Sequence, residues 1–104
     1  MPKTRDLAKV IRRDMARNRR LKAAVEQERL SGAIATLILD ARIDAGLTQK
    51  QLANLVGTQQ SVIARLEDAD YQGHSLSMLS RIATALGRSI SVSFVSPGKR
   101  KIGA

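Results

Sequence analysis

The chain has 104 residues, 43% of them hydrophobic, which suits one domain with one small core. It has no cysteine and one histidine, so disulfides and thiol chemistry are excluded, and we expect neither a metal site nor a cofactor. Without an apolar run long enough for a bilayer or a secretion signal, and without a catalytic motif, we expect a cytoplasmic protein that is not an enzyme and contacts no membrane.

The net charge of +9 is unevenly distributed. The first 30 residues hold ten basic and four acidic side chains, whereas residues 31–98 hold five of each. Three further cations follow, Lys99, Arg100 and Lys101. Cations at both ends of a neutral middle suit a polyanionic partner such as nucleic acid, because they displace its condensed counterions. A solvated, solubilising surface is the alternative interpretation.

The N-terminal region is predicted to be helical, because apolar residues recur at helical spacing at Leu7, Val10, Ile11 and Met15. We expect an amphipathic helix over 5–17 with an arginine-rich opposite face. Asn18-Arg19-Arg20 weakens the pattern and predicts a break. A second apolar stripe runs over 21–45, where Ser31-Gly32 interrupts it, so that one long helix and two shorter ones both fit.

Three short helices are predicted next. Thr48 and Gln51 form a capping-box pattern that opens the first, and Gly57 ends it. The second begins near Gln59 or Gln60, and Ser75 caps the third. The residues expected to face inward are Leu52, Leu55 and Val56, then Val62, Ile63 and Leu66, then Leu76, Leu79, Ile82, Ala83 and Leu86.

The last element is predicted to be a short strand over 89–95, because Ile90, Val92 and Phe94 alternate with polar residues. The chain offers no second strand to pair with it. A lone strand exposes unpaired backbone groups, and its cheapest partner is its own copy across a two-fold axis. We therefore expect a homodimer with these three residues at its interface, where they cover the last helix.

Residues 49–68 read QKQLANLVGTQQSVIARLED, in which two short helices meet at Gly57 and the small Ala53 allows close packing. This spacing resembles the helix-turn-helix of the lambda-repressor and Cro type, the Xre family, and the resemblance extends over about 37–87. It implies an all-α, lambda-repressor-like bundle with an N-terminal helical extension and the one C-terminal strand. The expected division is a basic helical extension at 1–29, a helix-turn-helix domain with its strand at 30–96, and a basic tail at 97–104.

In such modules the second helix lies in the major groove of double-stranded DNA. The resemblance places Gln59, Gln60, Ser61 and Arg65 at the base edges, where glutamine suits adenine and arginine suits guanine. It assigns phosphate contacts to Gln49 and Thr58, and to Glu67 a structural role at the end of the recognition helix. The family carries serine or threonine where Gln59 stands, so the helix cap is expected to pass to Thr58. A dimer predicts a palindromic operator.

The N-terminal helix and C-terminal strand together resemble the HigA-like antitoxins of type II toxin–antitoxin pairs. This implies that the N-terminal region, through Leu7, Val10, Ile11 and Met15, grips a RelE/HigB-like ribonuclease toxin while the domain represses the shared operon. The positive charge of this region argues against it, because RelE-type toxins tend to be basic. The alternatives are a stand-alone Xre-family repressor whose basic arms bind DNA, and a protein-interaction module that does not touch DNA. His74 is expected to be a loop or packing residue.

Overall fold

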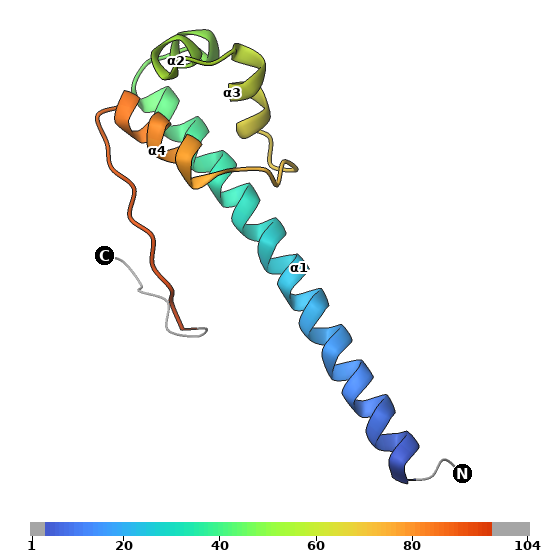
Figure 1. Cartoon of the computed structure of the whole chain (residues 1–104). Coiled ribbons are helices and arrows are strands. Elements are labelled where there is room, and N and C mark those ends of the chain that lie inside the picture. Colours follow the sequence, from blue (N-terminus) through green and yellow to red (C-terminus); the bar gives the residue numbers. More distant parts are fainter. Residues whose placement is uncertain (1–3, 97–104) are drawn as a thin grey trace.

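The computed structural model describes residues 4–96, and these form four helices (Figure 1). They are α1 (Thr4–Asp44), α2 (Gln49–Val56), α3 (Gln60–Leu66) and α4 (Leu76–Ala85). The all-helical class predicted from the sequence is confirmed for this part of the chain. None of the four helices combines the length and the apolar character that crossing a bilayer requires.

Helix α1 is a single helix of 41 residues, so the predicted break at Asn18-Arg19-Arg20 is wrong. Arginine is a good helix former, and this segment contains no glycine or proline that would end a helix. Ser31-Gly32 does not interrupt it either. Ser31 is buried there, and a Cβ built on Gly32 would lie 4.0 Å from the Ala69 carbonyl oxygen, so the loop after α3 passes close to the helix.

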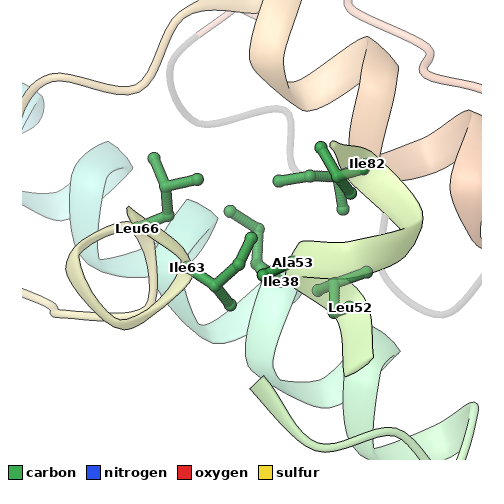
Figure 2. Packing of buried hydrophobic residues seen from close by; sticks show 7 residues of the cluster. Ile38, Leu52, Ala53, Ile63, Leu66 and Ile82 are labelled. Atoms are coloured by element: carbon green, nitrogen blue, oxygen red, sulfur yellow. The ribbon is translucent and has the colours of Figure 1, made fainter. Parts of the chain in front are cut away.

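The core is formed by the last third of α1 with α2, α3 and α4. Leu52 and Ile63 are fully buried, and Figure 2 shows both in the apolar cluster, with Ile38 and Ala53 labelled between them. The remaining buried members of the cluster are Ile38, Ala53, Val56, Leu66 and Ile82. Burial contributes about 1.5–3 kcal/mol for each large aliphatic side chain. Two residues predicted to face inward do not: Leu55 and Leu76 are exposed, because each lies on the solvent side of its short helix.

The helix ends follow the local chemistry of the sequence. The Thr48 hydroxyl accepts a hydrogen bond from the Gln51 backbone N–H at 3.1 Å, and the Gln51 side-chain oxygen accepts one from the Thr48 N–H at 2.9 Å. This confirms the capping box. The Ser75 hydroxyl likewise accepts from the Met78 N–H. Gly57 ends α2 at a φ of 81°, a left-handed conformation that glycine adopts without steric cost.

The predicted strand at 89–95 is not formed: residues 88–96 run without regular secondary structure. A strand is held by hydrogen bonds to a neighbouring strand, and no other segment between residues 4 and 96 is extended beside this one. Ile90 lines an apolar groove of about 250 Å³ between α1 and α4, whereas Val92 and Phe94 are exposed. In the single chain they therefore do not cover α4.

The long arm of α1 gives the molecule its shape, with extents of 66 × 33 × 18 Å. We define the arm as residues 4–30 and the bundle as residues 31–86. Figure 1 shows the arm extending away from α2, α3 and α4. No side chain in residues 6–30 is buried. The expected boundary between 29 and 30 therefore falls inside one helix, next to Ser31, its first buried residue.

Candidate nucleic-acid interface

The N-terminal turn of α3 is an exposed polar part of the bundle's helix-turn-helix. Gln59, Gln60, Ser61 and Arg65 are all exposed, whereas Ile63 and Leu66 on the other side of this helix are buried. The left-handed turn at Gly57 lets the chain reverse within three residues, so α3 packs across α2. The result is a short helix whose inner face is fixed by the core and whose outer face carries amides and one guanidinium.

A partly buried ion pair fixes the C-terminal end of α3. The Arg42 guanidinium, near the end of α1, donates Nε–H and Nη2–H to the two carboxylate oxygens of Glu67 at 2.7 and 3.0 Å. The side chains are only 14% and 4% exposed. Arg42 also donates to the Leu47 carbonyl at 2.8 Å. The hydrogen bond with Glu67 raises the pKa of Arg42 above its ordinary value, so the guanidinium stays charged. The structural role predicted for Glu67 is confirmed in this sense.

Gln49 belongs to the same network. Its side-chain Nε2 donates to Glu67 Oε1 at 3.2 Å, so the carboxylate links the end of α1, the start of α2 and the end of α3. An amide nitrogen carries two hydrogens, and one bond to Glu67 leaves the other available. Gln49 is half-buried at the first turn of α2, where backbone N–H groups also point outward. We call Arg42, Glu67 and Gln49 the clamp.

Thr58 is not the cap of α3, which corrects the prediction. Gln59 is the N-cap residue, with extended φ and ψ of −96° and 152°, and no side chain makes a capping hydrogen bond there. Thr58 is half-buried in the turn, and its backbone N–H donates to the Ala53 carbonyl at 2.9 Å. Through this hydrogen bond Thr58 helps to end α2.

Arg42 and Arg81 are functional residues of the scaffold that the sequence patterns did not single out. The Arg81 Nη2–H donates to the Val56 carbonyl at 2.8 Å and so satisfies the end of α2 beside Gly57. The signal available for Arg42 was the charge of Glu67, since a carboxylate at a helix–helix junction needs a cation when it is buried. With these two arginines engaged, the other cations at 31–96 are Lys50, Arg65 and Arg88, all exposed.

The loop after α3 is acidic and closed by local contacts. The Asp68 carboxylate accepts a hydrogen bond from the Asp70 N–H at 2.9 Å. His74 Nε2 lies 2.7 Å from the Leu66 carbonyl, at the end of α3, and its ring meets the Tyr71 ring edge-on. The prediction of a loop or packing role for His74 is confirmed. In the described part of the chain, no cluster of three or more His, Asp or Glu side chains is placed to hold a metal.

The other predicted interaction residues lie outside the bundle. The side chains predicted to grip a toxin are exposed on the arm, far along the chain from α3; they are Leu7, Val10, Ile11 and Met15. The predicted dimer residues Ile90, Val92 and Phe94 are exposed after α4, with Phe94 the most exposed. The three basic residues at 99–101 lie outside the described residues.

Comparisons with known proteins agree with this geometry. The model of the helix-turn-helix family matches residues 38–92, which covers the bundle except for residues 31–37 and leaves the arm unmatched. A protein of Methanothermobacter thermautotrophicus, described as an uncharacterized HTH-type transcriptional regulator, is 47% identical over 53 residues, covering 51% of this chain and 75% of that protein. No solved structure matches the chain. The chain belongs to the helix-turn-helix family.

Proposed function

We propose that this protein is a DNA-binding transcriptional regulator that inserts α3 into the major groove of double-stranded DNA. The supporting observation is the exposed polar turn of α3, held by the apolar core on one side and by the clamp at its end. Gln59, Gln60 and Ser61 lie at the start of α3 and Arg65 one turn later, the positions that meet base edges when such a helix enters the groove. Glutamine pairs with adenine and arginine with guanine.

Phosphate contacts would fix the register of the bundle on the duplex. Gln49 suits this role because Glu67 orients its amide and one amide hydrogen is left over. Thr58, in the turn before α3, is the second candidate. The acidic loop at 68–70 carries charge of the wrong sign for a phosphate, so α3 would approach DNA with its N-terminal end foremost.

The base-reading role is tested with Arg65→Ala. Operators selected from a pool of random duplexes supply the specific ligand, and random duplex supplies the competitor. Arg65→Ala should cost about 1–3 kcal/mol on the operator and relax selectivity at one position. Removing Lys99, Arg100 and Lys101 is the control, and it should weaken all duplexes alike and flatten the salt dependence. Unchanged selectivity in Arg65→Ala would show that α3 does not recognise bases as proposed.

A homodimer built through residues 90–94 would present two copies of α3 to a palindromic operator. The exposed Phe94 and Val92 lie along the chain just after Ile90, which lines the apolar groove between α1 and α4. Two such segments pairing antiparallel would satisfy each other's backbone groups and bury these side chains. The recognition helices would lie about 34 Å apart, one turn of DNA.

Phe94→Asp tests the dimer, because it places a charge in the proposed interface and leaves the bundle untouched. Operator affinity should fall by about a hundredfold or more, since linked half-sites add to each other's binding. Far-ultraviolet circular dichroism should show an unchanged helix content. An operator affinity equal to that of the unmodified chain would exclude this contact.

The antitoxin role is the finer proposal, and the projecting arm supports it. Within the described residues no side chain at 6–30 is buried, and the exposed Leu7, Val10, Ile11 and Met15 offer a surface for a RelE/HigB-like toxin. The basic character of the arm opposes a basic partner. A stand-alone Xre-family regulator is the alternative. A small reading frame next to this gene distinguishes them: its product should bind the full chain and fail to bind a chain lacking residues 1–20.

A further inference from the structure

The arm carries an apolar stripe that nothing in the described chain covers. Its large apolar side chains are between 46% and 65% exposed; they are Leu7, Val10, Ile11, Met15, Leu21, Val25 and Leu30. At 100° per residue, most of these residues lie on one side of α1, and this side is turned by roughly 120° from the side that carries Ser31, Ala35 and Ile38. The stripe is therefore not a continuation of the surface that packs on the bundle.

About residue 16 the arm repeats similar residues at six of the nine mirrored pairs between residues 7 and 25; the pairs Lys9/Ala23, Val10/Lys22 and Met15/Arg17 do not match. Leu7 mirrors Val25, Ala8 mirrors Ala24, and Ile11 mirrors Leu21. The arginine pair at 12–13 mirrors the arginine pair at 19–20, and Asp14 mirrors Asn18. Across a two-fold axis residue i of one copy meets residue j of the other and the reverse, so an antiparallel pair centred on residue 16 would bring these matching residues together.

From this symmetry we infer that the arm pairs with the arm of a second copy, antiparallel and centred on residue 16. Residue i then faces residue 32 − i of the second copy. Ile11 packs against Leu21 of the second copy and Leu7 against Val25. The positions 7, 11, 14, 18, 21 and 25 alternate in steps of four and three, the repeat that keeps a helix seam facing its partner.

The middle of this contact is polar and complementary. Asp14 faces Asn18 of the second copy, and the two-fold axis repeats this pair on its other side. The amide of Asn18 donates and the carboxylate of Asp14 accepts, so both polar groups find a partner inside an otherwise apolar seam. A shift by one heptad would place Asp14 against Ile11 or Val25, so this pair favours the centred alignment over its heptad neighbours.

Charge limits the strength of the contact and does not prevent it. Residues 6–30 hold eight basic and four acidic side chains, so two arms repel at long range. The arginines at 12, 13, 19 and 20 project away from the seam, however, where salt screens them. Pairing should strengthen as ionic strength rises, whereas a contact of the arm with DNA would weaken.

Antiparallel arms hold the two bundles at opposite ends of a rod. Residue 31 lies 15 residues from the centre, so the two copies of Ser31 are about 45 Å apart along the axis. That separation exceeds the one-turn spacing proposed for the contact at residues 90–94. Arm pairing is thus a second interface, fit to join two separate DNA sites, and it stands whether or not the bundle binds DNA.

Cysteine cross-linking of the full chain tests the register, because the chain has no cysteine of its own. Ile11→Cys and Leu21→Cys chains are mixed and oxidised, and disulfide-linked dimer is measured on a non-reducing gel. The mixture should give about tenfold more linked dimer than either chain alone, because these positions meet only across the antiparallel pair. The yield should rise between about 0.1 M and 1 M salt.

Arg13→Cys mixed with Arg19→Cys is the matched control. These two positions also mirror each other about residue 16 but project away from the seam, so the mixture should give background linking. Equal linking in both mixtures would show random collision and overturn the proposal. Self-linking of Ile11→Cys alone would show a parallel pair. No linking in any mixture would show that the stripe does not pair with a second copy. Either result overturns the proposal.

Discussion

One helix, α1, runs through two regions that differ in packing: its C-terminal part is buried in the bundle, and its N-terminal part is exposed. In the bundle its residues from Ser31 onward are fixed by tertiary packing, with Ile38 buried against Leu52 and Ile63. In the arm the same helix continues over 4–30 with no buried side chain in the stretch from residue 6. Most helical stability in proteins comes from tertiary packing, which the bundle part of α1 has and the arm lacks within the described chain. We therefore expect the bundle to fold without the arm, and we propose that the arm is an interaction surface.

The largest expected difference between the two regions is in the free energy of unfolding. Leu52→Ala removes a fully buried side chain and should lower this free energy by about 2–5 kcal/mol. At a protein concentration low enough to keep the chain monomeric, Leu21→Ala removes the same side chain from the exposed arm and should change this free energy by less than about 0.5 kcal/mol. Urea denaturation followed by circular dichroism compares the two. Similar losses would mean that the arm packs on the bundle.

Substitutions in the clamp should give a slightly smaller difference between the two regions in the free energy of unfolding. Glu67→Ala leaves Arg42 and the Gln49 amide without their partner and should lower the free energy of unfolding by about 3 kcal/mol. Glu26→Ala is the matched control, since Glu26 pairs with Arg29 in the same chemistry on the exposed arm. It should leave the unfolding midpoint unchanged. A comparable loss in both variants would show that the clamp contributes no more to stability than an exposed ion pair.

Two glycines should respond with opposite signs. Gly57→Ala forces a Cβ into a left-handed backbone and should destabilise the bundle by about 1–2 kcal/mol. Gly32→Ala lies inside α1, where the new Cβ has room, and should stabilise the chain by about 0.5–1 kcal/mol. Thermal unfolding of the two variants beside the unmodified chain measures both. A loss of stability in Gly32→Ala would mean that the loop at 68–70 packs more tightly on α1 than its distance indicates.

Features that depend on local chemistry were predictable from the sequence. The capping box at Thr48, the cap at Ser75 and the left-handed turn at Gly57 each follow from residues within one turn of the helix end. The buried members of the helix-turn-helix, such as Ile63 and Leu66, follow from helical spacing. The exposed turn of α3, with Gln59 and Arg65, follows from the same spacing together with the family resemblance.

Features that depend on distant parts of the chain were not. Whether Leu55 and Leu76 are buried depends on how their short helices pack against the rest of the bundle. Helical spacing shows only which residues of one helix lie on the same side. The partner of Glu67 lies 25 residues earlier, at Arg42. The alternation at 90–94 is compatible with a strand, yet a strand forms only where a neighbour supplies hydrogen bonds. The continuity of α1 through Asn18 was missed because a weak amphipathic pattern does not by itself end a helix.

The most direct test compares the full chain with a chain lacking residues 1–20, each titrated with the selected operator and with random duplex. The bundle and the clamp are intact in both, so the ratio of operator to random affinity should be the same. Absolute affinities should fall for both duplexes alike, because the arm carries cations. A loss of about tenfold or more in the ratio, with the bundle still folded, would contradict this division and place part of the sequence reading in the arm.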